Sequence, residues 1–239
     1  MTADPAAERV PGLDWDELRA ALDADGYALS SAPVLEADEC RELVAGFHDA
    51  RRFRSTVDMA RHRFGLGSYR YYSYPLPPAV AALRTATYPP LAALANEWAR
   101  RLGDPVTFPE RHADLVRICN QRGQSRPTPL ILRYQAGGWN ALHQDLYGEV
   151  AFPLQLTVAL TRPGQDFTGG ENLFVEQRPR SQSRGTSVTV PRGHAVIFPT
   201  CHRPVAGARG TYRATMRHGV STVTSGERFT LGVIFHEAT

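Results

Sequence analysis

Cysteine is scarce in this chain, and long apolar runs are missing. The three cysteines are scattered along 239 residues, too few for a disulfide framework or a cysteine-based zinc site, so we expect them to be reduced. No stretch approaches the roughly 18 uninterrupted apolar residues of a membrane span. The first ten residues contain Asp4, Pro5 and Glu8 where a signal peptide has basic and then apolar residues. We therefore expect a cytoplasmic protein.

Lysine is absent altogether, since all 27 basic residues are arginine, and the formal net charge is +3. Residues 1–110 hold 12 Arg and 16 acidic residues, whereas residues 111–239 hold 15 Arg and 8 acidic residues. Between Glu176 and Glu227 there are eight arginines and no acidic residue. The second half is therefore expected to meet an anion, although solvated arginines on a strand face explain such a pattern as well.

The composition is that of a globular chain, and it excludes disorder, collagen and coiled coil. Hydrophobic residues make up 42% of the sequence. A chain of this length buries about 70 to 75% of the surface that its unfolded form exposes. We expect one domain over residues 1–239, with a mainly helical support in 12–110 and a β-rich core in 111–239.

The first half carries three apolar stripes of helical spacing, at residues 15–22, 40–47 and 91–102. Pro89 and Pro90 suit the start of the third helix. Gly26 precedes a predicted short strand, and residues 64–74 are predicted as strand or loop because prolines follow them.

From about residue 114 the sequence changes to short β-prone runs separated by Gly and Pro. The runs predicted as strands are 130–135, 141–147, 152–161, 172–177, 186–190, 194–199, 213–223 and 228–236. Eight strands is the number of a double-sheet jelly roll. The expected fold class is therefore α+β, a jelly-roll (double-stranded β-helix) core with N-terminal supporting helices.

A candidate metal site begins with His143-Gln144-Asp145. Residues two apart in a strand project from the same face, so the imidazole and the carboxylate can bind one ion together. With one further His they form a 2-His-1-carboxylate facial triad, which leaves three positions of Fe(II) open for a bidentate cosubstrate and O2. By itself the motif also occurs as a surface His beside a surface Asp.

Support comes from the region before the last predicted strand. His218 follows Asp145 by 73 residues and precedes Arg228 by ten, across a Ser-Gly turn. With Phe167-Thr168-Gly169-Gly170-Glu171 between them, this order resembles the 2-oxoglutarate- and Fe(II)-dependent dioxygenases, especially the prolyl-hydroxylase-like branch. Gly26-Tyr27 and the 40–47 helix also resemble that family's N-terminal support, so the resemblance covers most of the chain.

The resemblance implies a role for each motif residue. His143, Asp145 and His218 would be the catalytic metal ligands, with Fe(II) as cofactor and 2-oxoglutarate and O2 as cosubstrates. Two neutral imidazoles and one carboxylate keep the metal electrophilic. Arg228 would bind the distal carboxylate of 2-oxoglutarate with its two-pronged donor set. Glu171 is expected to complete the Gly-Gly turn.

Tyr134 lies nine residues before His143 in a Leu-x-Leu-x-Tyr alternation. It resembles a cosubstrate-contacting Tyr of the family, and it is interpreted equally well as an aromatic core residue. Some relatives have a second Tyr in the strand after the first motif, but residues 154–160 contain none. We therefore expect another group, Thr157 or a further Arg, to complete the cosubstrate pocket.

His202 is the alternative to His218 as the distal ligand. It lies in a predicted loop, residues 199–204, and Tyr212 stands ten positions later where an anchoring basic residue is needed, so His218 is favoured. Asn140 and Gln144 are expected at the mouth of the site. The remaining histidines are predicted to be solvated or hydrogen-bonded; they are His48, His62, His112, His194 and His236.

Two Arg-rich segments, 121–129 and 176–184, together with residues 143–148, resemble an uncharacterised prokaryotic branch of the superfamily that has been suggested to act on alkylated nucleic acid. Arginines near the site suit a phosphate-bearing substrate. Hydrogen bonds that hold the loops together explain them equally well. Under the first interpretation, Arg178, Arg180 and Arg184 contact phosphates.

The leading hypothesis is an oxygenase that hydroxylates or oxidatively demethylates an anionic substrate, with nucleic acid or a nucleotide ahead of a free amino acid. A protein side chain and a small metabolite stay open as substrates, and no membrane partner is expected. The non-enzymatic alternative is a metal-binding, cupin-like sensor, which has no need of Arg228. A pure nucleic-acid-binding module is the third hypothesis, but its usual motifs are missing.

Overall fold

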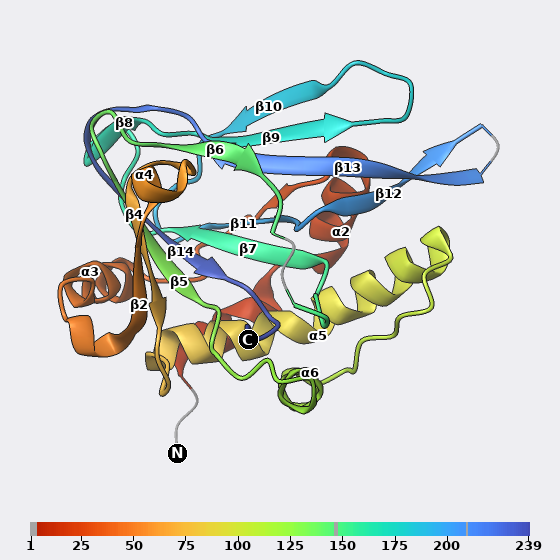
Figure 1. The fold of residues 1–239 in the computed structure, drawn as a ribbon, viewed down its shortest axis with the longest axis horizontal. Helices are drawn as coiled ribbons and strands as arrows, with labels where there is room; N and C mark the ends of the chain where they lie inside the picture. Colours follow the sequence, from red (N-terminus) through yellow and green to blue (C-terminus); the bar gives the residue numbers. More distant parts are fainter. Residues whose placement is uncertain (1–3, 146–147, 209) are drawn as a thin grey trace.

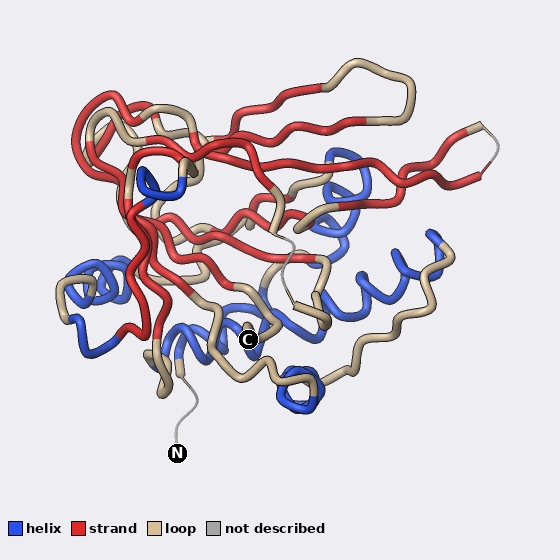
Figure 2. The backbone as a smooth tube through the Cα atoms, in the orientation of Figure 1, coloured by secondary structure: helices blue, strands red, loops and turns tan. Residues whose placement is uncertain are grey.

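The strands of the computed structural model form two antiparallel sheets that lie face to face, and helices cover the outer side of the larger sheet (Figures 1 and 2). The structure describes residues 4–145, 148–208 and 210–239. Within these ranges, no helix combines the length and the apolar character that crossing a bilayer requires.

The major sheet has the strand order β1-β11-β7-β14-β5-β4-β2, and β8 pairs with one end of β14. Its strands are β1 (Ala28–Leu29), β2 (Phe53–Asp58), β4 (Ser68–Tyr72), β5 (Leu130–Gln135), β7 (Leu154–Ala159), β8 (Phe167–Gly169), β11 (Ala195–Pro199) and β14 (Val223–Val233). The minor sheet has the order β10-β9-β13-β6-β3, and β12 pairs with β13. Its strands are β3 (Gly65–Leu66), β6 (Trp139–His143), β9 (Asn172–Gln177), β10 (Arg184–Val188), β12 (His202–Gly207) and β13 (Gly210–Val220).

The helices come mainly from the first half of the chain. They are α1 (Pro5–Arg9), α2 (Trp15–Asp25), α3 (Ala37–Gly46), α4 (Met59–His62), α5 (Pro78–Leu102) and α6 (His112–Gln121), with short 3-10 turns at Val10–Gly12 and Ala50–Arg52. The same half also supplies β1 to β4. The short helices α1 and α4 are not predicted by the sequence, and neither are β2 and α6, because β2 is a half-buried edge strand without clear alternation and α6 buries only three residues.

Helix α5 differs from the sequence prediction. The pattern places a helix start at Pro89 and Pro90, but the helix begins at Pro78 and contains both prolines. An internal proline removes a backbone donor and normally interrupts a helix. Here Leu83, Tyr88 and Leu91 are buried on both sides of the interruption. Packing against the major sheet therefore outweighs the missing hydrogen bonds.

The two faces of the major sheet contact different surroundings, because side chains alternate along each strand. On β7, Leu156 and Val158 belong to the main core between the sheet and the helices, whereas Thr157 faces the space between the sheets. On β14, Leu231 belongs to the core and Thr230 faces the inter-sheet space. The outer face stabilises the fold and leaves the inner face free to carry chemistry.

A buried ion pair fixes the C-terminal segment to α5. The guanidinium of Arg84 donates to Glu237 Oε1 at 2.9 Å, to three successive backbone carbonyls of residues 234–236 at 2.8 to 3.2 Å, and to Thr128 and Tyr74 hydroxyl oxygens at 3.3 Å. Both side chains of the pair are almost fully buried. Gln124 then ties the Glu237 carbonyl to both backbone groups of Val150.

His112 lies in an aromatic cluster with Tyr88 and Phe235, and its Nε2 is 2.9 Å from the Phe235 carbonyl. Burial, and secondarily Arg84, lower the pKa of His112 to about 4. The unfolded chain therefore binds a proton more readily between about pH 4 and 6.5, so the free energy of unfolding falls as the pH is lowered through that window.

We expect His112→Gln, which keeps a donor but does not titrate, to lose less stability than the wild type between pH 7 and pH 5, by about 1 to 2 kcal/mol. Urea unfolding at the two pH values measures the difference. Equal losses in the His112→Gln protein and the wild type would contradict the expectation.

Candidate active site

A cavity of about 520 Å³ opens between the two sheets. Its floor is the inner face of β7, β14, β5 and β4, and its roof is formed by β6, β9 and β13. Apolar clusters close the inter-sheet space around it, and Phe174, Phe198, Tyr134 and Val220 belong both to these clusters and to the cavity wall. The cavity contains all the residues that the sequence assigns to the metal and to the cosubstrate.

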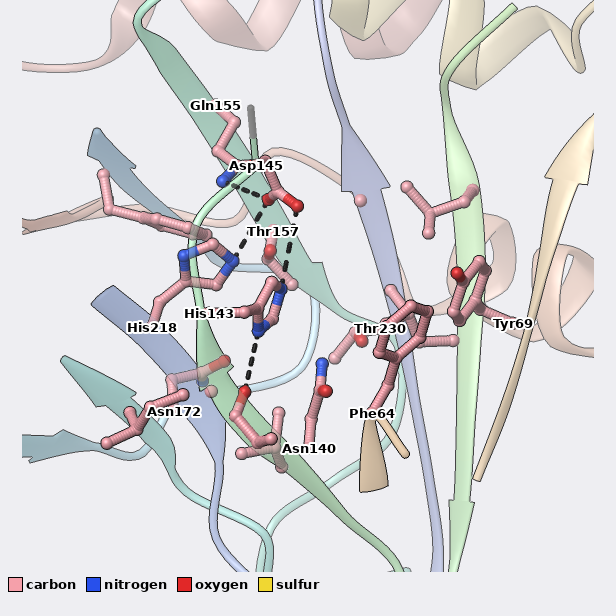
Figure 3. A pocket seen from close by; sticks show the side chains of 18 of the residues that line it. Phe64, Tyr69, Asn140, His143, Asp145, Gln155, Thr157, Asn172, His218 and Thr230 are labelled. Atoms are coloured by element: carbon pink, nitrogen blue, oxygen red, sulfur yellow. Dashed lines mark hydrogen bonds and ion pairs between the residues drawn. The ribbon is translucent and has the colours of Figure 1, made fainter. Parts of the chain in front are cut away.

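His143, Asp145 and His218 converge at one side of the cavity (Figure 3). His143 ends β6 and His218 lies on β13, and the two are direct partners in the β6–β13 register, with ring centroids 4.2 Å apart. Asp145 lies two residues beyond the end of β6. The sequence predicts a strand over 141–147; its last two residues lie outside the described ranges, and the strand ends at His143.

Neighbouring residues hold Asp145 in place after the strand has ended. Its backbone N–H donates to the Thr200 carbonyl at 3.2 Å, and Gln155 on β7 donates to Oδ2 at 2.7 Å. Gln144 is turned away toward β13, where its amide donates to the Met216 carbonyl at 3.0 Å. Gln144 and Asp145 are therefore held by partners on β13 and β7.

The three side chains present a donor set suited to a divalent metal. His143 Nε2 is 3.7 Å from Asp145 Oδ1, and His218 Nε2 is 3.2 Å from Asp145 Oδ2. Ligands in adjacent positions of a metal bound at about 2.1 Å lie about 3 Å apart, so the spacing fits after a small inward movement. His143 Nδ1 is 2.7 Å from the Ala141 carbonyl, which leaves Nε2 as the free lone pair.

The protonation states agree with a ligand role. Burial, with a smaller contribution from His218, lowers the pKa of His143, so its imidazole is neutral at pH 7. Burial of Asp145 opposes ionisation, yet His218, His143 and the Gln155 amide outweigh burial and hold the pKa of the carboxyl below its ordinary value. A neutral imidazole at His143 and an ionised carboxylate at Asp145 are donors of the kind that the facial triad uses.

Arg228 lies deep in the same cavity and is 3% exposed. Its guanidinium donates to Asn172 Oδ1 at 3.1 Å, reaches Thr230 Oγ1 at 3.5 Å, and lies 5.4 Å from the centre of the Tyr134 ring. Among the described residues no carboxylate lies within ion-pair distance of it. Burial lowers the pKa of Arg228 to about 10, so it remains charged at pH 7. A buried, unpaired cation of this kind requires an anion to offset its desolvation.

The Gly169-Gly170-Glu171 turn makes room for this arginine. Gly170 has φ +66°, and a Cβ there would lie 2.9 Å from both Arg228 Cδ and Val223 Cγ2. Glu171 bonds Ser221 through its side chain and its backbone N–H. These contacts agree with the expected role of Glu171 in the turn. The turn packs against Arg228 through Gly170.

The opposite side of the cavity is aromatic and aliphatic. Tyr69 and Tyr71 on β4 lie opposite Leu132 and Leu130 on β5, on the same inner face. Phe64 lies beside Tyr69, on the side of the cavity away from His143, Asp145 and His218 (Figure 3). The floor therefore changes from polar at β7 and β14 to aromatic at β4.

The other residues named from the sequence are placed as follows. Tyr134, Thr157, Asn140 and Gln144 line the cavity. Tyr134 is fully buried in an apolar cluster, and its ring lies beside the Arg228 guanidinium. His202 lies in strand β12 rather than in a loop, because its segment pairs with β13, where it is the partner of Thr215. Its side chain is not part of the cluster of possible metal ligands among the described residues.

The arginines of segment 176–184 do not line the cavity. Arg178 forms an ion pair with the buried Glu176, and Arg184 lies 4.0 Å from Asp25. Arg180 is at the tip of the β9–β10 hairpin, with φ 60°. For Arg178 these contacts favour the interpretation that the arginine holds its loop together.

Sequence reasoning missed Gln155, Asn172, Tyr69, Tyr71 and Phe64. Asn172 directly follows the Gly-Gly-Glu turn, so its position carries a signal once the turn is recognised. Tyr69 and Tyr71 alternate in the segment 64–74, which the sequence predicts as strand or loop, but nothing local shows that this segment pairs with β5. Long-range pairing therefore decides which side chains reach the site.

Comparison with known proteins assigns this chain to a family. Residues 67–238 match the model of Oxygenase-NA, described as an oxygenase catalysing oxidative methylation of damaged DNA. Two curated sequences from strains of Mycobacterium tuberculosis, both called uncharacterised proteins, are 45% identical over 181 residues, which is 74% of this chain and 78% of theirs.

Solved structures with a similar fold include two prolyl hydroxylases and a further oxygenase. The prolyl-4-hydroxylase of Pseudomonas putida has TM-score 0.51 and 17% identity, over 94% of this chain and all of that one. A 2OG-Fe(II) oxygenase family protein from Burkholderia pseudomallei has TM-score 0.54 and 18% identity, over 94% and 93%. The prolyl hydroxylase of Trichoplax adhaerens has TM-score 0.58 and 14% identity, over 97% and 90%. The predicted jelly-roll core is confirmed.

Proposed function

We propose, from the premise that this chain belongs to the Oxygenase-NA family and is a 2-oxoglutarate- and Fe(II)-dependent oxygenase, that His143, Asp145 and His218 bind the iron and Arg228 binds 2-oxoglutarate. One observation carries the proposal. The facial-triad donor set and a buried arginine without a carboxylate partner among the described residues share one cavity.

The residues present fit the metal and the cosubstrate. Three protein ligands would leave iron able to bind a 2-oxo acid and O2, and the bound metal would couple the oxidative decarboxylation of 2-oxoglutarate to succinate and CO2 with C–H hydroxylation, O2 being the oxidant. Arg228 would grip the distal carboxylate of 2-oxoglutarate, with Asn172 holding the guanidinium in orientation. Thr157 and Thr230 line the same side of the cavity and would replace the second Tyr that β7 lacks.

The substrate that we propose is a nucleic acid, hydroxylated or oxidatively demethylated at a carbon placed beside the metal. The family description names damaged DNA, and the aromatic side of the cavity suits a flat, apolar-faced group. Hydroxylation of a carbon that bears a nitrogen releases an aldehyde, so one site can perform both reactions. A free amino acid, a protein side chain or a small metabolite is the alternative substrate.

The assay is anaerobic reconstitution with Fe(II) and 2-oxoglutarate, followed by admission of O2 and measurement of succinate. Substrate-independent succinate formation establishes the oxygenase reaction, and a panel of alkylated oligonucleotides and amino acids then identifies the substrate by increased turnover. A protein that binds Fe(II) but forms no succinate under any of these conditions would favour the metal-binding sensor.

Replacing Arg228 separates cosubstrate binding from metal binding. In Arg228→Ala we expect Fe(II) binding to survive, while the 2-oxoglutarate concentration for half-maximal turnover rises by about one to two orders of magnitude, since charge-assisted bonds contribute about 1.5 to 3 kcal/mol. Arg228→Lys should be milder because it keeps the charge and loses the fork geometry. An unchanged 2-oxoglutarate titration in Arg228→Ala would assign the cosubstrate to another group.

A further inference from the structure

We propose that segment 61–66, which comprises the end of α4, the turn at 63–64 and strand β3 and is called the α4–β3 turn below, is the strand-binding element of this protein. In this assignment Arg63 contacts a phosphate of a single-stranded nucleic acid, and Phe64 packs on the base that enters the aromatic side of the cavity. The inference rests on the proposed function, because it names the substrate contacts of that same site.

The aromatic side of the cavity is built to take a planar group. Tyr69 and Tyr71 lie edge to face, with ring centroids 5.5 Å apart, and Leu130 and Leu132 continue the same surface. The surface is recessed between two sheets, so a base reaches it only from a single strand or after leaving its stack.

The turn presents an exposed aromatic residue at the edge of this recess. Phe64 lines the cavity, yet 47% of its surface is exposed, and its ring stacks on His62 at 5.4 Å between centroids. Leu142, on the adjacent β6, also lines the cavity and is 45% exposed. Exposed apolar side chains gathered at the rim of a cavity are typical of a binding surface.

The turn is held rigidly against β6. Gly65 and Leu66 pair with Asn140 and Trp139, and Ala141 donates its backbone N–H to the Phe64 carbonyl at 2.7 Å. A Cβ at Gly65 would lie 2.2 Å from the Trp139 carbonyl oxygen, so only glycine allows this approach. Phe64 is therefore positioned by the strand that also carries His143.

Arg63 supplies an unpaired positive charge beside Phe64. It is exposed, lines the cavity, and has no carboxylate within ion-pair distance among residues 4–145, 148–208 and 210–239. Its backbone is left-handed, with φ 60° and ψ 28°, at the end of α4, where glycine is the preferred residue. Arginine in that conformation does not stabilise the fold. Binding through the guanidinium is the role that we assign to Arg63.

A second cation lies at the Tyr71 end of the aromatic surface. The Arg54 guanidinium is 4.5 Å from the centre of the Tyr71 ring and donates to the Pro127 carbonyl at 2.9 Å. No acidic side chain of the described residues forms an ion pair with it. Arg54 and Arg63 thus flank the aromatic surface, an arrangement of cations and rings that suits a strand whose bases stack and whose phosphates face solvent.

The β9–β10 hairpin offers a matched control within the same chain. Arg180 is the other arginine with φ 60° in the described residues, it is exposed, and it lies outside the cavity lining. Arg63→Gly and Arg180→Gly therefore make the same change of charge and relieve the same backbone conformation. Only the place of the lost guanidinium differs.

The test measures binding of a short fluorescein-labelled single-stranded oligodeoxynucleotide by anisotropy at several salt concentrations. For Arg63→Gly we expect weaker binding and a log–log salt slope reduced in magnitude by about 0.7, the value for one phosphate contact. The Arg180→Gly protein should keep the wild-type slope.

Phe64→Leu, which keeps an apolar side chain but removes the ring, should weaken binding about tenfold or more and leave the slope unchanged. Unlabelled mononucleotide should compete far less well than unlabelled oligonucleotide.

Thermal unfolding accompanies each variant, and the Arg63→Gly midpoint should be no lower than that of the wild type, which excludes misfolding as the cause of weaker binding. A slope unchanged in Arg63→Gly, or reduced equally in Arg180→Gly, overturns the inference. So does a wild type that forms succinate but binds no oligonucleotide at low salt. Failure of the proposed function is distinguishable, since it shows as a wild type that forms no Fe(II)- and 2-oxoglutarate-dependent succinate at all.

Discussion

Asp145→Ala and His143→Ala are each expected to reduce Fe(II)-dependent succinate formation by more than about a hundredfold. Removing a residue that only orients a ligand already costs about 10- to 100-fold in metal affinity or activity, and these residues are proposed to be the ligands themselves. Asp145 also carries the one negative charge of the donor set, which neutralises part of the charge of the ion. The measurement is succinate formed per enzyme at saturating 2-oxoglutarate, together with Fe(II) content after desalting.

The two distal histidines provide the matched comparison for this result. His218→Ala should behave like His143→Ala, because both imidazoles face the Asp145 carboxylate. His202→Ala should retain iron and turnover, since His202 lies on β12 and contacts Thr215 at 3.5 Å. Wild-type turnover in Asp145→Ala, or loss of iron in His202→Ala with retention in His218→Ala, would move the metal site elsewhere.

Arg84→Met should lower the free energy of unfolding by about 3 to 5 kcal/mol, the cost of leaving the other member of a buried ion pair uncompensated. Arg84 also satisfies the carbonyls of residues 234–236, which methionine cannot do. Urea unfolding at neutral pH measures the difference. The control is Arg100→Met, on the same helix and exposed, which should change stability by less than about 0.5 kcal/mol.

A double variant tests whether the pair itself is responsible. Arg84→Met combined with Glu237→Met should cost less than the sum of the two single changes, because neither charge is then left buried without its partner. Strict additivity, or a loss in Arg84→Met no larger than in Arg100→Met, would contradict the assignment of stability to this pair.

Much of the β core can be predicted from the sequence, because alternation and turn residues are local signals. The predicted strands at 130–135 and 172–177 coincide with β5 and β9. Helix α5 is predicted wrongly at its start, since Pro89 argues locally for a boundary that burial of Leu83 and Tyr88 overrides. Strand β12 is missed because Pro204 argues for a loop, although a proline is tolerated where a strand pairs on one side only.

The polar side of the site is foreseeable for a chemical reason. Residue type and spacing point to His143 and Asp145 as a pair, and the resemblance to the dioxygenase family singles out His218 and Arg228. Their assigned roles stay predictions until the variants are measured. The aromatic side has no such code, because Tyr69 and Phe64 look like ordinary core residues until β4 pairs with β5 and the α4–β3 turn pairs with β6.

The change from polar to aromatic across the cavity floor has a consequence for how such a protein can diverge. The residues proposed for iron and 2-oxoglutarate lie on β6, just after β6, and on β13 and β14, within the stretch that matches the family model, whereas segment 61–66 lies just before that match begins at residue 67. Exchange of the Arg63 or Phe64 side chain changes the rim of the cavity without replacing any residue proposed to hold iron or 2-oxoglutarate. Selectivity for the substrate can therefore change at the rim of the cavity while the residues proposed for the oxidative chemistry stay the same.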